Sequence, residues 1–117
     1  MADTCTLYHN PRCSKSRQTL ALLEARGIAP AVVNYLQSPP DADTLEALLG
    51  MMALEPRDLM RRKEPEYAAN NLDDDNKTRA ELIQAMIDHP ILIERPIVVR
   101  GGRAVIGRPP ENVLALV

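Results

Sequence analysis

One cysteine stands in a short segment whose residue types favour thiol chemistry. The segment reads Tyr8-His9-Asn10-Pro11-Arg12-Cys13-Ser14-Lys15-Ser16-Arg17. A β-type run precedes it and a helical run follows, so Cys13 is predicted to lie where a strand passes into a helix. The first turn of a helix presents unpaired N–H groups and the positive end of its dipole, which favour a thiolate and a bound oxyanion. Because Arg12, Lys15 and Arg17 add positive charge, we predict a thiol of lowered pKa that attacks, or lies beside, a small tetrahedral anion.

The composition argues against several other classes of function. The chain has 117 residues, a formal net charge of −2 and only three aromatic residues, all tyrosine. A basic surface with stacking aromatics is not expected, and neither is binding of nucleic acid. No apolar run approaches the roughly 20 residues of a membrane span, and no signal peptide is evident. Two cysteines without an export signal predict a reducing, cytoplasmic location.

Neither a disulfide nor a metal site is expected. Cys5 lies early in the first predicted strand, whereas Cys13 lies beyond its far end, which is too far for a disulfide. Cys5 is therefore predicted to be a small buried hydrophobic residue. No two Cys or His residues have metal-ligand spacing on one element, and no Gly-rich loop could hold the phosphates of a nucleotide. No bound metal or cofactor is expected.

Apolar periodicity and turn signals predict the order of the elements. They predict a strand at 4–8, a helix to about 26, a strand at 32–35, helices at about 41–52, 56–62 and 78–89, a hairpin of strands 97–100 and 103–106, and a last helix at about 111–117. The first three elements form a βαβ unit, whose two strands should be parallel. Without repeats or linkers, residues 1–117 are predicted to be a single domain with a helical insertion between two halves of one sheet.

This order, with a cysteine after the first strand and an X-Pro bond before the third, resembles the thioredoxin superfamily. Separate motifs along nearly the whole chain resemble one family within it, the glutaredoxin-coupled arsenate reductases. The motifs are Tyr8-His9-Asn10-Pro11-x-Cys13-x-x-Ser16-Arg17, Tyr35-Leu36-x-x-Pro39-Pro40, Leu59-Met60-Arg61, His89-Pro90-Ile91-Leu92-Ile93-x-Arg95-Pro96-Ile97-Val98-Val99 and Gly107-Arg108-Pro109. The resemblance implies a thioredoxin-like α/β fold: a four-stranded mixed sheet with helices on both faces. It also implies a cis bond between Arg95 and Pro96.

The resemblance further implies an oxidoreductase that reduces arsenate to arsenite. Cys13 matches the nucleophile, which forms a thiolate–arsenic adduct. Glutathione, a co-substrate rather than a bound cofactor, then enters, and arsenite leaves. Glutaredoxin clears the mixed disulfide that remains. The three oxyanion-binding arginines of the family match Arg95, Arg108 and Arg61, with the neighbouring Arg62 as the alternative for the third.

Three residues of the cysteine segment are expected to support this site. His9 matches a histidine near the cysteine, Ser16 matches a hydroxyl that can hydrogen-bond the thiolate, and Asn10 belongs to the same motif. We expect a cytoplasmic monomer whose partners are arsenate, glutathione and glutaredoxin, with no nucleic acid and no membrane among them.

Two other functions remain open at this point. One is a glutathione-binding thiol oxidoreductase with a different substrate. The other is a partner-binding regulator, since a sister branch of the family binds RNA polymerase and senses oxidation through a Cys-x-x-Cys pair. Here Ser16 occupies the second cysteine position, so that disulfide cannot form. This argues against the oxidation sensor but leaves another protein partner open.

Overall fold

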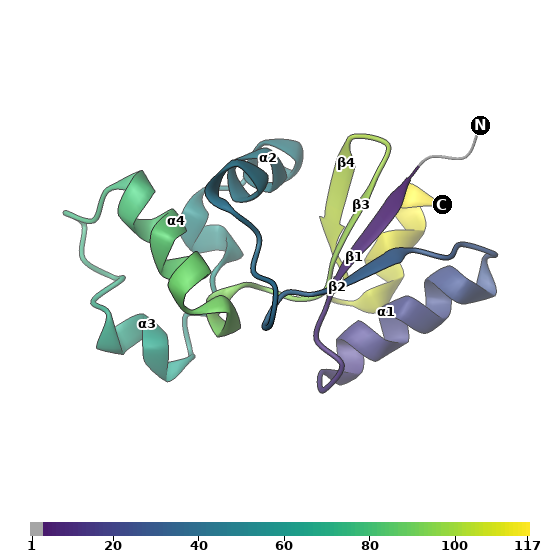
Figure 1. Ribbon diagram of the computed structural model, residues 1–117, viewed down its shortest axis with the longest axis horizontal. Coiled ribbons are helices and arrows are strands. Elements are labelled where there is room, and N and C mark those ends of the chain that lie inside the picture. The colour runs from purple at the N-terminus through teal and green to yellow at the C-terminus, as the bar shows by residue number, and fades with distance from the viewer. Residues whose placement is uncertain (1–3) are drawn as a thin grey trace. The chain divides into compact units, whose positions relative to one another are not determined.

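A computed structural model describes residues 4–117, in which a run of helices separates the first two strands from the last two (Figure 1). The elements are β1 (Cys5–His9), α1 (Ser14–Ala25), β2 (Ala31–Asn34), α2 (Ala42–Met52), the 3-10 helix η1 (Pro56–Leu59), α3 (Pro65–Ala69), α4 (Arg79–Asp88), the 3-10 helix η2 (Pro90–Leu92), β3 (Ile97–Arg100), β4 (Arg103–Ile106) and the 3-10 helix η3 (Pro110–Leu116). The chain forms two compact units. The sheet unit comprises the residues up to 38 together with 95–117, and the helical unit comprises residues 39–94. The helical unit corresponds to the predicted insertion.

The sheet is mixed and has the strand order β2-β1-β3-β4. On β1, Leu7 lies opposite Val32 of the parallel strand β2 and opposite Val98 of the antiparallel strand β3. The hairpin of β3 and β4 turns at Gly101 and Gly102, whose φ angles of 59° and 78° suit a two-residue turn. The predicted α/β class, the parallel βαβ unit and the hairpin are therefore confirmed.

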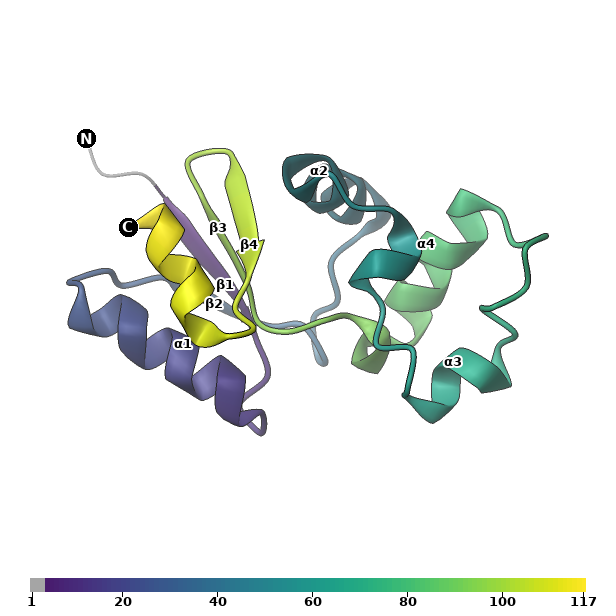
Figure 2. The same cartoon turned by 180° about the vertical axis from the view of Figure 1, so that it is seen from behind.

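One face of the sheet is covered by α1 and η3, which contact each other and lie side by side in both views (Figures 1 and 2). Alternate strand residues point to this face, because successive side chains of a strand point to opposite sides. The core consists of Cys5 and Leu7 of β1, Leu23 of α1, Val98 of β3, and Val113 and Leu116 of η3. Cys5 is thus the small buried residue that was predicted. The packing fixes α1, and with it the start of α1, relative to the end of β1.

In the helical unit, α4 contacts α2 and both short 3-10 helices. The side chain of Asp41 accepts a hydrogen bond from the Thr44 N–H at the start of α2. Thr78 and Glu81 form a capping box at the start of α4. The inward faces of the two helices carry buried Leu45, Leu48, Leu49, Leu82, Ile83 and Met86. Caps and apolar spacing together explain why both helices were predictable.

Three predicted helix assignments were wrong in detail. The helix expected at 56–62 is only the turn η1, because Met60 adopts an extended conformation and forms a β-bridge with Ile93. Flanking bonds from the Arg61 N–H to the Leu92 carbonyl and from the Glu94 N–H to the Leu59 carbonyl hold this pairing. At Pro65, in a stretch for which no element was predicted, α3 begins with proline in its first turn. The last helix, η3, is a 3-10 helix.

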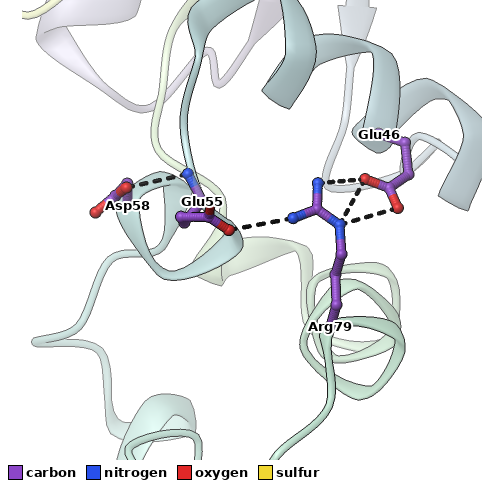
Figure 3. Close-up of polar contacts among 4 residues, drawn as sticks. All are labelled: Glu46, Glu55, Asp58 and Arg79. Atoms are coloured by element: carbon purple, nitrogen blue, oxygen red, sulfur yellow. Dashed lines mark hydrogen bonds and ion pairs between the residues drawn. The ribbon is translucent and has the colours of Figure 1, made fainter.

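Arg79, the first residue of α4, joins three elements of the helical unit (Figure 3). Its Nε and Nη2 atoms donate to a carboxylate oxygen of Glu46 on α2 at 3.0 and 2.6 Å. Its Nη1 atom donates to Glu55, at the start of η1, at 3.2 Å. The Glu55 N–H in turn donates to Asp58. This guanidinium is therefore bound to carboxylates on both sides.

Within residues 4–117, no helix is both long enough and apolar enough to cross a membrane.

Candidate active site

Cys13 occupies the N-cap of α1, with an extended backbone (φ −93°, ψ 124°). Its N–H donates to the Asn10 carbonyl at 3.0 Å, and its carbonyl accepts from the Arg17 N–H at 3.1 Å. The thiol is free and partly buried. The N-cap position turns the sulfur towards the N–H groups of the first helical turn, and the sequence predicted this position at the start of a helix.

Local hydrogen bonds fix the loop between β1 and α1. The side-chain oxygen of Asn10 accepts from the Arg12 N–H at 3.0 Å, an Asx turn that replaces missing backbone partners. Arg17 donates from Nη1 to the Pro11 carbonyl at 2.9 Å. Arg17, expected only as a nearby positive charge, thus also ties the loop to the first turns of α1.

His9 and Ser16 form a buried pair beneath the cysteine. His9 ends β1, and its Nδ1 atom lies 2.5 Å from the Ser16 hydroxyl oxygen, which also accepts from the Asn10 N–H at 3.0 Å. Burial, and then the charge of Arg17, lower the pKa of His9, which favours the neutral ring. If Nδ1 is the accepting nitrogen, the Ser16 hydroxyl donates its proton there and every member of the pair is satisfied. The hydroxyl of Ser16 thus contacts His9 and Asn10, and its expected hydrogen bond to the thiolate stays a prediction.

Two arginines, one shortly before β3 and one shortly after β4, reach the sulfur of Cys13. Arg108 donates from Nη1 to the Cys13 Sγ at 3.9 Å and to the Arg95 carbonyl at 3.3 Å. The Nε and Nη1 atoms of Arg95 are buried and have no hydrogen-bond partner. Arg95 and Arg108 each precede a proline in a cis peptide bond, as predicted for the Arg95–Pro96 bond. The fold thus places two buried guanidinium nitrogens without a hydrogen-bond partner close to the thiol.

The pKa of the Cys13 thiol lies below its ordinary value. Burial by itself raises this pKa, but the Ser16 N–H, the Arg95 guanidinium and the Lys15 N–H together outweigh that effect. The opposite holds for Cys5, whose pKa is raised by burial despite the charge of Arg100. Of the two thiols, only Cys13 lies where a thiolate and an oxyanion are both favoured.

Comparison with known proteins identifies the family to which this arrangement belongs. The sequence profile of the ArsC family matches residues 8–116, which include the cysteine segment, both cis prolines and η3. The chain belongs to the ArsC family. Its thioredoxin-like fold follows from the solved structures that it matches.

Two relatives and one solved structure match this chain over nearly their whole length. "Uncharacterized protein YfgD" of Escherichia coli (strain K12) is 53% identical over 118 residues, which cover 100% of this chain and 99% of the relative. "Arsenate reductase" of Neisseria meningitidis serogroup A is 48% identical and covers 94% of this chain and 95% of the relative. The solved structure titled "Arsenate reductase from Vibrio cholerae" is 50% identical, covers 100% of both chains and superposes with a TM-score of 0.96.

Arg61, the third arginine suggested by the ArsC resemblance, belongs to the helical unit. Its Nε atom donates to Glu64 at 3.1 Å, and its Nη1 atom lies 3.9 Å from Glu94. The alternative, Arg62, pairs with Asp58 at 3.4 Å and donates to the Arg57 carbonyl. The role of Arg61 in anion binding therefore stays a prediction, as does that of Arg62.

Sequence reasoning missed the carboxylates beside Arg61. The spacing of three between Arg61 and Glu64 could have indicated the first of these pairs, since such neighbours meet within one turn. The second could not be foreseen, because Glu94 approaches only through the β-bridge of Met60 with Ile93. Within residues 4–117, no group of three or more His, Cys, Asp or Glu side chains is arranged to hold a metal ion.

Proposed function

We propose that this member of the ArsC family is an arsenate reductase that draws its electrons from glutathione and is recycled by glutaredoxin. One observation carries the proposal: a thiol of lowered pKa at the start of α1 lies beside the partly buried Arg95, whose guanidinium has two buried nitrogens without a partner. Buried donors without partners cost free energy, so their presence beside a nucleophile suggests a ligand that supplies the missing acceptors. The names of relatives such as the Neisseria protein support arsenate as that ligand.

The charges of the site suit arsenate chemically. Arsenate near neutral pH is a multiply charged tetrahedral anion, so an attacking thiolate brings like charges together. Cations placed where the charge develops offset this repulsion. A guanidinium suits the task because its planar fork can hold two oxygens at once and does not lose its proton. In this proposal Arg95 and Arg108 hold the oxygens of arsenate over Cys13, and Arg61 is the third candidate.

The proposed reaction begins with attack by the Cys13 thiolate on arsenic. A bond forms between sulfur and As(V), and one arsenate oxygen leaves as water after it has taken up protons. The thiolate of glutathione then attacks the Cys13 sulfur. Its electron pair forms the S–S bond, and the electron pair of the S–As bond stays on arsenic, which departs as As(III) in arsenite. A glutaredoxin thiol finally attacks the mixed disulfide and releases the Cys13 thiolate.

The positions of the two cysteines support an external thiol as the reductant. The chain contains two cysteines, and Cys5 lies at the opposite end of β1 from the Cys13 loop. A strand rises about 3.3 Å per residue, so the five residues of β1 separate the two thiols well beyond disulfide reach. Cys5 therefore cannot resolve an intermediate on Cys13. A small external thiol such as glutathione can, and its abundance in reduced form makes the cytoplasm the proposed location.

The test is a coupled assay of the full chain with arsenate, glutathione and glutaredoxin, in which arsenite formation is measured directly. The parent protein should form arsenite, and Cys13→Ser should abolish turnover while it still binds arsenate in calorimetry. Cys5→Ser is the matched control, because it removes the other thiol and should leave turnover unchanged.

Two outcomes would contradict the proposal. Turnover by Cys13→Ser would remove Cys13 as the nucleophile. A parent protein that forms a mixed disulfide with glutathione but yields no arsenite would instead favour the thiol oxidoreductase with another substrate. Omission of glutaredoxin should stop turnover after one cycle and leave glutathione bound to Cys13, as mass spectrometry would show.

A further inference from the structure

Gly107 lies where its own segment meets the segments of Thr19 and Pro96 in the sheet unit. A Cβ atom at this position would lie 2.6 Å from the Thr19 Oγ1 atom and 2.8 Å from the Pro96 Cγ atom. Its N–H donates to the Pro96 carbonyl at 2.9 Å. Its φ angle lies outside the left-handed region that favours glycine. Glycine is therefore needed here for space, not for backbone conformation.

Each of the three segments carries one member of the candidate site. Thr19 lies on α1, whose N-cap is Cys13, and its hydroxyl donates to the Lys15 carbonyl at 2.9 Å. Pro96 directly follows Arg95, and Gly107 directly precedes Arg108. Thr19, Pro96 and Gly107 are all buried, so none of them can yield into solvent. Whichever segment gave way to an added methyl group, a sulfur or a guanidinium would be displaced.

We propose that Gly107 is a positioning residue that sets how closely Arg95 and Arg108 approach the sulfur of Cys13. The three segments can pack against one another at Gly107 because this residue has no side chain. Their packing then fixes the distance between the Cys13 thiol and the guanidinium groups of Arg95 and Arg108. Protein interiors are close-packed and pass such displacements on to neighbouring groups. Because arsenate is the anion held in this arrangement, the inference rests on the proposed function.

The experiment compares Gly107→Ala with the parent protein. Arsenate affinity is measured by calorimetry, and the Cys13 thiol pKa by the pH dependence of alkylation, resolved for the Cys13 peptide by mass spectrometry. We expect arsenate affinity to fall by about tenfold or more, the effect of losing one charge-assisted hydrogen bond. The Cys13 thiol pKa should rise towards its ordinary value. A purely structural defect would lower the thermal midpoint but would leave both quantities unchanged in the folded protein.

The double variant Thr19→Ala/Gly107→Ala keeps the test decisive if Gly107→Ala does not fold. Thr19→Ala removes the hydroxyl oxygen that lies closest to the added Cβ atom of residue 107. The contact of that Cβ atom with the Pro96 Cγ atom at 2.8 Å remains. The arsenate affinity of the double variant should therefore lie between those of Gly107→Ala and Thr19→Ala. If Gly107→Ala does not fold, the double variant must bind arsenate more weakly than Thr19→Ala, and equal affinities would overturn the proposal.

Gly50→Ala is the matched control, because an added Cβ at Gly50 meets nothing within 4 Å. It should leave arsenate affinity, turnover and the Cys13 thiol pKa unchanged. A Gly107→Ala protein that folds and keeps the parent affinity and thiol pKa would overturn the positioning role. Absence of arsenite formation by the parent would refute the proposed function instead. The shift of the Cys13 thiol pKa in Gly107→Ala would still report on positioning.

Discussion

Arg95 in the sheet unit and Arg79 in the helical unit are both arginines held by the fold, but their guanidinium groups differ in what they bind. Arg79 is exposed and donates to Glu46 and Glu55, so its charge is matched by two carboxylates. Arg95 has two buried nitrogens without a hydrogen-bond partner and lies beside a partly buried thiol. The guanidinium of Arg79 thus finds its hydrogen-bond acceptors within the protein. The guanidinium of Arg95 leaves two donors without an acceptor, which the proposed function assigns to an anion.

This difference separates a structural arginine from one available to a ligand. Exposed ion pairs contribute little to stability, because water and salt screen them. A buried donor without an acceptor costs stability, and such a cost persists in functional sites where a ligand removes it. Two buried nitrogens without a partner therefore make Arg95 a candidate to bind arsenate, whereas Arg79 is already paired with carboxylates.

The strongest test of the comparison is Arg95→Ala. Loss of its charge-assisted hydrogen bonds should weaken arsenate binding by about ten- to a hundredfold, or roughly 1.5–3 kcal/mol. The thermal midpoint should stay near that of the parent, because two unsatisfied buried donors leave with the side chain. Calorimetry with arsenate and thermal unfolding measure the two quantities. Parent-like affinity in this variant would show that Arg95 does not bind the oxyanion, and the comparison would fail.

The next prediction concerns the pH dependence of Cys13. Because its pKa is lowered, the thiolate should form, and alkylation should reach its plateau, at a lower pH than for an ordinary thiol. In Arg95→Ala the pKa should rise, and the alkylation curve should move to higher pH. Cys5, whose pKa is raised, is the internal reference and should react only at still higher pH. If the Cys13 curve is the same in the parent and in Arg95→Ala, the guanidinium does not act on the thiol.

The sequence predicted those parts of the site that depend on local structure. Cys13 at a helix start follows from the strand, the Asn10-Pro11 break and the helical run after it, all within about twenty residues of each other. Arg95 and Arg108 came from the resemblance, and their approach to Cys13 requires the pairing of β1 with β3 and of β3 with β4. Such pairing joins residues far apart in the chain, so no local pattern reveals it.

What the sequence did not reveal depends on partners distant in the chain. Met60 reads as part of a helix, but its bridge to Ile93 ends the turn after Leu59. The need for glycine at position 107 is set by Thr19 and Pro96, which meet it only in the folded sheet unit.

The smallest expected effect is that of Arg79→Ala, which removes a satisfied guanidinium. The thermal midpoint should fall slightly at neutral pH and low salt, and the loss should shrink as salt is added. Arg79 lowers the pKa of Glu46 below its ordinary 4.5. The stability that Arg79 contributes through Glu46 is therefore fully present above pH 4.5 and is lost as the pH falls through the pKa of folded Glu46. Arg26→Ala is the control, because Arg26 is exposed and forms no ion pair within residues 4–117.

Arsenate affinity should equal that of the parent in both Arg79→Ala and Arg26→Ala. A clear loss of affinity in Arg79→Ala would show that satisfied and unsatisfied arginines do not divide as proposed.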